Sequence, residues 1–570
     1  MFWVAAVVAR YRATAPRHGD PDDVGFSPDN APAATRRLED PGMTDETDVL
    51  IIGAGLSGGI TASTLAEAGV RVVCLEQGDW PDYANARADF DDYELTTDRF
   101  WARDPNVRGG LADYPVDDTS SDISALMWNG VGGGTVLYSG KWHRMTPSDF
   151  RVRSHDGVAD DWPLTYEELE PFYVEAERQM GVSGLAGDPA YPVGDGPPNP
   201  PVPIRESGRR LARALNDLGW HWWPGGNAIS TTHYRDLKPC RQHGACMSGC
   251  PEGAKASTDI THWPRAMRAG ADLRTRCRVS RILTEAGRVT GAVYRDARGR
   301  DHEVRARTVI LCANGIGTPR LLLMSADGGL ANSSGLVGKR LMMHPFAAVA
   351  GVFDEDLGTT QGAWGQQIQS MHFYETEADR GFVRGAKWGL QPTGGPLGLT
   401  RSYPWSESER SLWFDSFHDT LEARLGRSPM WSIVAEDLPY EKNAVSLSVD
   451  LVDSDGLPAP RIEYRADENS KSMLDFHTAR AVESMEVAGA VETVVGPMIR
   501  SSGWHLMGTA VMGDDPTTSV TDRWGRCHDV PNLHIFDSST WVTCGGVNPA
   551  ATQAAMALRS STHLLEEGPQ

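Results

Sequence analysis

The clearest pattern of apolar positions lies near the start of the chain, where two apolar runs flank a glycine-rich turn and an alanine-rich segment. The first run and its turn read Asp48-Val-Leu-Ile-Ile-Gly53-Ala-Gly55-Leu56-Ser57-Gly58, and the second run, Val72-Val-Cys-Leu, ends at Glu76. Short apolar runs rich in branched residues are typical of buried parallel strands, and the segment between them has the composition of a helix. The pattern therefore predicts a strand, a tight turn, a helix and a second strand, in this order.

The glycines of this unit, Gly53, Gly55 and Gly58, predict a site for the pyrophosphate of a dinucleotide. In such units they turn the chain, admit the backbone close to the phosphates and let the helix pack on the strand, while the helix N-terminus attracts the anion. Glu76 ends the second strand, where a carboxylate can accept hydrogen bonds from a ribose. An ordinary strand-to-helix loop is the alternative, and the order of strand, helix, strand and acid favours the dinucleotide site.

A second glycine-rich stretch spans residues 128–142 and reads Trp-Asn-Gly-Val-Gly-Gly-Gly-Thr-Val-Leu-Tyr-Ser-Gly-Lys-Trp. Glycines let a backbone lie close against a flat ligand, because side chains at those positions would clash. A flexible linker is the alternative, but linkers rarely carry three large aromatic residues among their glycines. We therefore expect a ligand contact here and place Gly132, Gly133, Thr135 and Tyr138 in it.

Residues 273–311 form short apolar runs, one of which contains Val279, separated by Gly and Asp turns. This spacing predicts a small meander of strands. The last run leads into Cys312-Ala313-Asn314-Gly-Ile-Gly-Thr-Pro, which again has the order of strand, glycine turn and helix. From Phe346 to about Val494 the chain is rich in Trp, Gln and Tyr and contains alternating strands, which predict a sheet with one face open to solvent or a ligand.

Length and charge narrow the classes of protein that fit these patterns. The chain has 570 residues, of which 54 are basic and 76 acidic, and its formal net charge is −22. So long a chain favours two lobes over one core. The negative charge disfavours nucleic acids and anionic membrane surfaces, and no apolar run reaches the ~20 residues that cross a bilayer. We therefore expect a small-molecule substrate, no nucleic-acid partner and no membrane span.

The N-terminal segment and the cysteine content indicate the cellular compartment of the protein. Residues 11–42 are polar and rich in Pro, Asp and Arg, so we expect residues 1–42 to form a flexible extension. The apolar stretch at residues 1–10 is short and lacks the basic start of a signal peptide. Eight cysteines in so long a chain do not make a disulfide framework. Both features predict a cytoplasmic protein.

Three of the cysteines stand close together in Cys240-Arg-Gln-His243-Gly-Ala-Cys246-Met-Ser-Gly-Cys250-Pro. The spacing matches a bacterial iron–sulfur run, except that His243 replaces the second cysteine. Three thiolates could hold an iron–sulfur cluster that lacks one iron, but the segment could also be a tight structural loop or an incidental zinc site. Because a fourth ligand is missing, we do not favour the cluster and assign no metal ligands.

Two segments near the end of the chain carry candidate chemistry. One reads Gly503-Trp-His505-Leu-Met-Gly508-Thr, and the other runs from Phe536-Asp537 to Asn548-Pro549 and an alanine-rich segment. Pro549 predicts the first turn of a helix. The first N–H groups of that helix could stabilise negative charge that develops on a reduced ring.

Taken together, these blocks resemble the glucose-methanol-choline oxidoreductase family, flavoproteins that oxidise alcohols, from about Asp48 to the C-terminus. The resemblance implies an α/β fold with a Rossmann-like FAD-binding domain and a discontinuous α+β substrate-binding domain built on an antiparallel sheet. We expect residues 43–345 and 495–570 to form the FAD-binding domain, with 150–235 partly contributing to the substrate lobe, and residues 346–494 to form the substrate-binding domain.

The resemblance also implies roles for individual residues. The catalytic pair over the flavin would be His505 and Asn548, Asp537 would contact the flavin nucleotide, and Val279 would lie by the adenine. The full set of expected FAD-binding residues is Gly53, Gly55, Leu56, Ser57, Gly58, Glu76, Gly132, Gly133, Thr135, Tyr138, Val279, Ala313, Asp537, Asn548 and Pro549. FAD should be bound without a covalent bond, because the stretch where some relatives attach it carries no histidine before His143.

The chemistry of the residues agrees with this implication. A histidine, with an ordinary pKa near ~6.5, can take the proton of an alcohol at neutral pH while hydride passes to flavin N5. We expect the substrate to be a sugar, glycoside or polyol and the electron acceptor to be oxygen or another redox partner. The alternatives are a non-sugar alcohol as substrate, an electron-transfer subunit with a cluster at Cys240, Cys246 and Cys250, and a flavin-binding protein without catalysis.

Overall fold

The computed structural model describes residues 46–83, 114–250, 252–402 and 416–569, so the extension expected at residues 1–42 lies outside the described residues. The first predicted unit is confirmed. β1 (Glu46–Ile52) and β2 (Val72–Leu75) are parallel neighbours, and α2 (Leu56–Glu67) connects them. All four residues of β2 are buried, as a strand covered on both faces requires.

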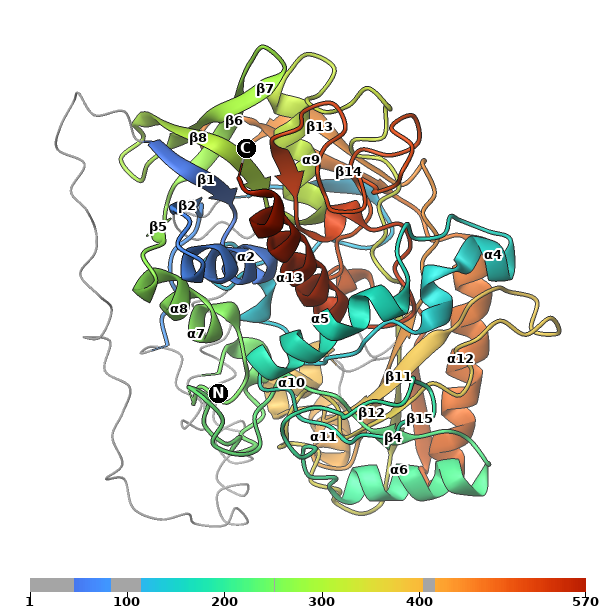
Figure 1. Ribbon diagram of the computed structural model, residues 1–570. Helices are drawn as coiled ribbons and strands as arrows, with labels where there is room; N and C mark the ends of the chain where they lie inside the picture. The colour runs from blue at the N-terminus through green and yellow to red at the C-terminus, as the bar shows by residue number, and fades with distance from the viewer. Residues whose placement is uncertain (1–45, 84–113, 251, 403–415, 570) are drawn as a thin grey trace, which may run out of the picture.

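These strands belong to a seven-stranded sheet (Figure 1). Its other members are β5 (Asp272–Arg274), β6 (Arg278–Glu285), β7 (Arg288–Arg295), β8 (Asp301–Leu311) and β16 (Leu533–Ile535). The order is β5-β2-β1-β8-β7-β6, and β16 pairs with the end of β8. Pairing is parallel from β5 to β8 and at β16, whereas β6, β7 and β8 form the predicted antiparallel meander.

Helices pack on this sheet. The chain turns from β8 into α9 (Asn314–Ser325), as predicted, and α9 contacts β6. The C-terminal helix α13 (Ala550–Glu567) lies beside α2 and α5 (Tyr166–Gln179), although α2 and α13 are almost 500 residues apart in sequence (Figure 1). The start and the end of the described chain therefore build one layer together. The expected helix after Pro549 is confirmed, with Pro549 as its N-cap residue.

A second sheet is fully antiparallel, in the order β15-β9-β12-β11-β10-β4. Its strands are β4 (Trp223–Pro224), β9 (Phe346–Val352), β10 (Ile368–Ser370), β11 (Ala386–Gln391), β12 (Met430–Ala435) and β15 (Glu492–Gly496). The expected fold class, a parallel nucleotide-binding sheet with a separate antiparallel sheet, is confirmed.

Side chains alternate between the two faces of the antiparallel sheet, because the period of a strand is two residues. On one face, Trp388, Trp431 and neighbours pack in a buried core with α6 (Glu206–Asp217) and α12 (Glu468–Val487). The residues between them, such as Lys387 and Ser432, face the opposite way. This opposite face is therefore free to carry polar groups.

One of the alternating strands expected between Phe346 and Val494 is β13 (Ala444–Val452), but it does not join the antiparallel sheet. It pairs with β14 (Pro458–Tyr464), which pairs with β3 (Asp117–Ser121) in a three-stranded sheet. β13 and β14 contact α9 instead. Alternation predicted the strand but not the orientation of all its residues, because past the register shift that follows Leu447 the apolar Val449 is 88% exposed and the polar Ser448 is buried. The pattern also carried no information on which sheet the strand joins.

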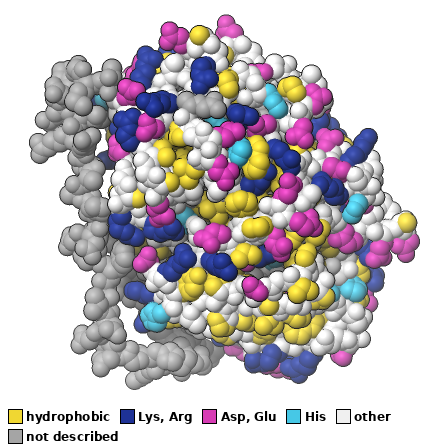
Figure 2. All heavy atoms as spheres, viewed as in Figure 1, with side chains coloured by type: hydrophobic (Ala, Val, Ile, Leu, Met, Phe, Trp, Pro, Cys, Tyr) yellow, Lys and Arg dark blue, Asp and Glu magenta, His cyan; other side chains and the backbone are white. Residues whose placement is uncertain are grey.

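The remaining helices are short: α4 (Val152–Asp156), α7 (Thr258–Thr261), α8 (Trp263–Arg268), α10 (Pro396–Ser402) and α11 (Phe417–Arg424). Within the described ranges, no helix has the length and apolar character needed to span a bilayer. Acidic and basic side chains are interspersed over the face of the molecule seen in Figure 2.

Candidate active site

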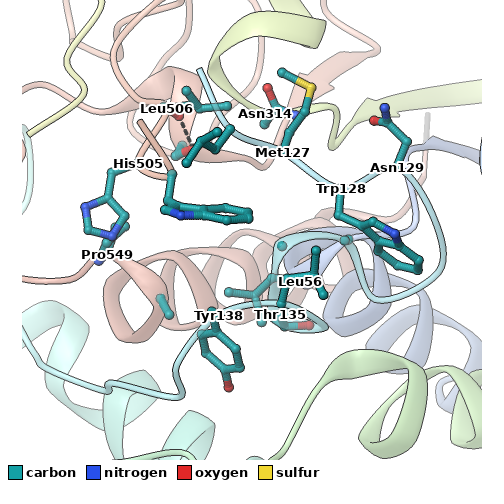
Figure 3. A pocket seen from close by; sticks show the side chains of 18 of the residues that line it. Leu56, Met127, Trp128, Asn129, Thr135, Tyr138, Asn314, His505, Leu506 and Pro549 are labelled. Carbon is teal, nitrogen blue, oxygen red and sulfur yellow. Dashed lines mark hydrogen bonds between the residues drawn. The ribbon is translucent and has the colours of Figure 1, made fainter. Parts of the chain in front are cut away.

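One large cavity, of about 960 Å³, lies where the first sheet meets the antiparallel sheet. The carboxyl ends of β1, β2 and β8 open into it, and residues of β9 and β12 line it from the other side. In Figure 3, His505 and Pro549 lie at one side of the cavity and Trp128 at the other, with Leu56 and Thr135 between them. The carboxyl edge of a parallel sheet is where α/β proteins bind their ligands.

The structure brings the predicted site residues together. The predicted residues that line this cavity are Gly53, Gly55, Leu56, Ser57, Glu76, Gly133, Thr135, Tyr138, Val279, Ala313, His505, Asp537, Asn548 and Pro549. Gly58 and Gly132 do not line it. A Cβ on Gly58 would lie 2.0 Å from the carbonyl oxygen of Gly53, and one on Gly132 would lie 2.7 Å from Asp259 Oδ1. Both glycines therefore shape the walls by close packing and do not face a ligand.

The two acids of the site are held by the chain itself. Glu76 accepts the backbone N–H of Ala54 through Oε2 and that of Gly78 through Oε1, both at 2.8 Å. Burial raises the pKa of Glu76, and these backbone hydrogen bonds oppose the rise. Each oxygen keeps a second lone pair, so a ribose hydroxyl can still donate to Glu76.

Asp537 has a similar arrangement at the start of α9. Its Oδ2 accepts the N–H of Asn314 at 3.1 Å and the hydroxyl of Thr318 at 2.5 Å, and its Oδ1 accepts the N–H of Ser539. Burial raises the pKa of Asp537 as well. Asp537 thus ties the loop before α13 to the first turn of α9, and it lines the cavity from that position.

The walls fit FAD at two points. α2 and α13 both begin at the cavity, and neither has a side-chain cap within the described part of the chain, so their first N–H groups are free for a ligand. A Cβ on Gly133 would lie 2.7 Å from Gly55 Cα, which shows how closely the two glycine-rich stretches approach. The uncapped start of α2 suits a pyrophosphate, and that of α13 suits a ring that gains negative charge.

His505 is the histidine on the wall near α13. Its Nε2 lies 3.4 Å from Asn548 Nδ2, and its Nδ1 lies 2.8 Å from Nδ1 of a second histidine, His344. The other nitrogen of His344, Nε2, donates to the carbonyl oxygen of Gly545. Burial lowers the pKa of His505 well below its usual value, and electrostatic interactions with the ionisable side chains of His344, Lys387 and Lys141 lower it further.

Asn548 is oriented from the antiparallel sheet. Lys387 Nζ donates to Asn548 Oδ1 at 2.7 Å and to Gln366 Oε1 at 3.1 Å. Burial, and then the nearby Lys141, lower the pKa of Lys387 well below its usual value. Lys141 itself lines the cavity and donates to Gln391 Oε1 at 2.9 Å, and burial lowers its pKa to about 7.

Sequence reasoning missed His344, Lys387 and Lys141. A signal for Lys387 was present, because it stands between the apolar residues Ala386 and Trp388 on a strand and must face away from their core. No comparable signal marked His344. Of the tryptophans in the Trp-, Gln- and Tyr-rich part of the chain, Trp364 lines the cavity, whereas Trp388 belongs to the helix-covered core.

Cys240, Cys246 and Cys250 are free thiols, and Met247 between them lines the cavity. Burial raises the pKa of Cys240 to about 11 and that of Cys246 to about 12. Backbone N–H groups of Gln242 and Trp364 donate to the sulfurs of Cys240 and Cys246. Among the described residues, no three His, Cys, Asp or Glu side chains are placed to hold a metal ion.

The fold and the cavity define an α/β protein that binds a dinucleotide at the carboxyl edge of its parallel sheet. Sequence comparison is more specific. The chain matches a family model of an FAD binding domain over residues 46–92, and models of GMC oxidoreductases over residues 209–346 and 439–557. This chain belongs to the GMC oxidoreductase family and is an FAD-dependent oxidoreductase that acts on alcohols. The expected resemblance is confirmed.

Several characterised relatives match nearly the whole chain. Over 91% of its length it is 42% identical to 2-methyl-1,2-propanediol dehydrogenase of Mycolicibacterium austroafricanum, 95% of which is covered. It is 32% identical to 6'''-hydroxyparomomycin C oxidase of Streptomyces lividus, with 93% of each chain covered. It is 28% identical to the fructose dehydrogenase large subunit of Gluconobacter japonicus, with 92% of this chain and 99% of the relative covered.

Proposed function

We propose that this enzyme oxidises a CH–OH group of a sugar, glycoside or polyol to a carbonyl, with His505 as the general base and Asn548 beside it. The observation that carries the proposal is the position of His505 Nε2, 3.4 Å from Asn548 Nδ2, on the cavity wall at the N-terminus of α13. FAD, when bound in the cavity, supplies the acceptor for the hydride that leaves the alcohol carbon.

His505 would take the hydroxyl proton of the substrate. An alcohol is too weak an acid to lose this proton without a base. Burial lowers the pKa of His505, so its ring is neutral at pH 7 and can accept a proton. Asn548 can donate an N–H to the substrate oxygen and hold it at His505, while Lys387 keeps the Asn548 amide in place.

The polar part of the cavity supports a substrate with several hydroxyl groups. Gln391 and Ser432 line it from the antiparallel sheet, Lys141 lines it beside Gln391, and together they offer both donors and acceptors. The names of the relatives refer to a diol, to fructose and to hydroxyparomomycin C. These names support a polyhydroxylated substrate and leave both oxygen and other acceptors open for the electrons.

We also propose that FAD is bound without a covalent bond. Tyr138 lines the cavity in the stretch where a linking histidine would be expected, and its hydroxyl donates to the carbonyl of Ala256. The nearest histidine, His143, is buried against Gln369. Acid precipitation should release all flavin into the supernatant, and yellow colour in the pellet would contradict this.

Eight free cysteines support a location in the cytoplasm.

The test of the function is anaerobic mixing of the FAD-loaded protein with sugars, polyols and simple alcohols while the flavin absorbance is followed. We expect bleaching by at least one polyhydroxylated compound. His505→Ala should retain the flavin spectrum and lose roughly 10²- to 10⁴-fold of the bleaching rate, the usual contribution of a general base. His233→Ala, at an exposed histidine, is the control. Normal bleaching by His505→Ala would exclude His505 as the base.

A second candidate function is electron transfer through a cluster at Cys240, Cys246 and Cys250. Backbone N–H groups donate to two of the sulfurs, as they do in iron–sulfur proteins, although among the described residues the three thiols are not placed together to hold a metal ion. Iron and sulfide analysis of anaerobically purified protein separates the two functions. Stoichiometric iron that is lost in Cys246→Ser would establish the cluster, and protein without iron that still bleaches with substrate would exclude it.

A further inference from the structure

His344 stands next to the proposed base in an unusual backbone conformation. It is fully buried, and its φ of 53° lies in the left-handed region, just before Pro345. A non-glycine residue in this region is strained, and such strain persists only where the surrounding structure enforces it. The conformation holds the imidazole of His344 between Gly545 and His505.

The hydrogen bonds of His344 determine where the protons lie. The carbonyl oxygen of Gly545 can only accept, so Nε2 of His344 carries a proton. Burial lowers the pKa of His344 to about 4, so near neutral pH the ring has one proton and its Nδ1 is an acceptor. The partner at 2.8 Å, Nδ1 of His505, must therefore carry a proton and donate it. Nε2 of His505 is left without a proton.

The hydrogen bonds of Asn548, on the other side of His505, indicate the same tautomer independently. Lys387 donates to Oδ1 of Asn548, so the amide must turn its Nδ2 toward His505. An N–H group that faces Nε2 of His505 requires an acceptor there. The hydrogen bonds thus form a chain in which each group donates to the next, in the order Lys387, Asn548, His505, His344 and Gly545.

We propose that His344 is a positioning residue that holds His505 in the Nδ1–H tautomer, so that Nε2, which faces Asn548 at the cavity wall, is left without a proton. When Nε2 takes the proton of the alcohol, the new imidazolium keeps its Nδ1–H bond to His344. This inference rests on the proposed role of His505 as the base, but the tautomer is a property of the protein without substrate.

The tautomer is measured first, in FAD-loaded wild-type protein without substrate. ¹⁵N-histidine labelling separates a ring nitrogen with a proton from one without, and the His505 signals are identified by their loss in His505→Gln. We expect a proton on Nδ1 and none on Nε2 of His505. A proton on Nε2 would overturn the proposal whatever the activity. If the wild type oxidises no alcohol, the proposed function fails and the tautomer result stands separately.

Two variants then test the role of His344. His344→Asn keeps an acceptor near the Nδ1 position and tolerates a positive φ, whereas His344→Leu offers no acceptor. We expect His344→Leu to mix the tautomers and to lower kcat roughly 10²-fold or more, since a wrongly protonated catalytic histidine costs ~10⁴-fold in a serine protease. His344→Asn should stay within about tenfold of the wild type and keep the Nδ1–H signal.

The control is His262→Leu, at a histidine that is equally buried but bonds to Thr261 and Gln179 away from the cavity. It should change thermal stability without changing kcat or the His505 signals. A wild-type kcat and unchanged His505 signals in His344→Leu would overturn the proposal. Equal losses of kcat in the Leu and Asn variants, with the tautomer unchanged in both, would also overturn it.

Discussion

Lys387 Nζ lies 2.7 Å from Asn548 Oδ1, and this contact sets which end of the Asn548 amide faces His505. The two residues are 161 positions apart and come from the antiparallel sheet and from the loop before α13. The antiparallel sheet therefore takes part directly in arranging the proposed catalytic pair. Lys387 has Gln366 as its other acceptor, so it is held from both sides.

Replacement of Lys387 should disturb the amide and leave the flavin site intact. Lys387→Met has a similar volume and no donor, so the Asn548 amide loses the bond that orients it. We expect kcat with the best alcohol to fall roughly tenfold, the lower end of the effect of supporting hydrogen bonds, and the FAD content to stay unchanged. Lys387→Gln, which retains an N–H donor, should lie between Met and wild type. An unchanged kcat in Lys387→Met would show that Asn548 needs no such support.

The pH dependence of the wild type should reflect the lowered pKa of His505. Burial lowers this pKa, and electrostatic interactions with the ionisable side chains of His344, Lys387 and Lys141 lower it further. A lower pKa keeps the base unprotonated to lower pH, so the acid limb of kcat/KM should lie below the ordinary value of ~6.5. Rate measurements between pH 4.5 and 8 check this. An acid limb at or above pH 6.5 would contradict the assignment.

Asn548→Asp should move that limb in the opposite direction. The variant places a carboxylate where the amide now lies 3.4 Å from His505 Nε2. A nearby negative charge stabilises the imidazolium and raises the pKa of the histidine. We therefore expect the acid limb of kcat/KM to shift to higher pH and the rate at pH 7 to fall. Asn548→Ala removes the amide without adding charge and should lower the rate without this shift. An acid limb of kcat/KM at the same pH in both variants would show that the side chain at position 548 does not affect the pKa of His505.

Local patterns in the sequence were sufficient for the nucleotide side of the fold. The strand, turn and helix from Glu46 to Glu67 depend on neighbouring residues, since Gly53 must adopt a φ of 103° and a Cβ on Gly58 would strike the Gly53 carbonyl. Such constraints are visible within a dozen residues. The pairing of β13 with β14 and β3 was not visible, because the alternation of a strand does not name its partner.

The candidate site, too, could be predicted only in part from the sequence. His505 and Asn548 stand in recognisable glycine-rich frames, but the partner of His505 is His344, 161 residues earlier in the chain. Its role depends on a carbonyl of Gly545 and on a left-handed backbone, neither of which has a sequence signature. Lys387 could have been found by its position in an alternating strand, whereas its contact with Asn548 required the packing of two distant segments.

Adjacent glycines allow a last prediction, on the cofactor. Gly133 has a φ of 51°, and a Cβ on it would lie 2.7 Å from Gly55 Cα. Gly134 also lines the cavity, but a Cβ on it would meet no protein atom within 4 Å. Gly133→Ala should push apart the two glycine-rich stretches, at a cost of roughly 1–3 kcal/mol, and lower both the FAD content and the melting temperature of the FAD-free protein. Gly134→Ala adds a methyl group to the cavity alone, so it should leave the FAD-free melting temperature unchanged and weaken FAD binding. Fluorescence titration with FAD and thermal melts of both variants check this. Wild-type FAD affinity in Gly133→Ala would mean that this stretch does not hold the cofactor.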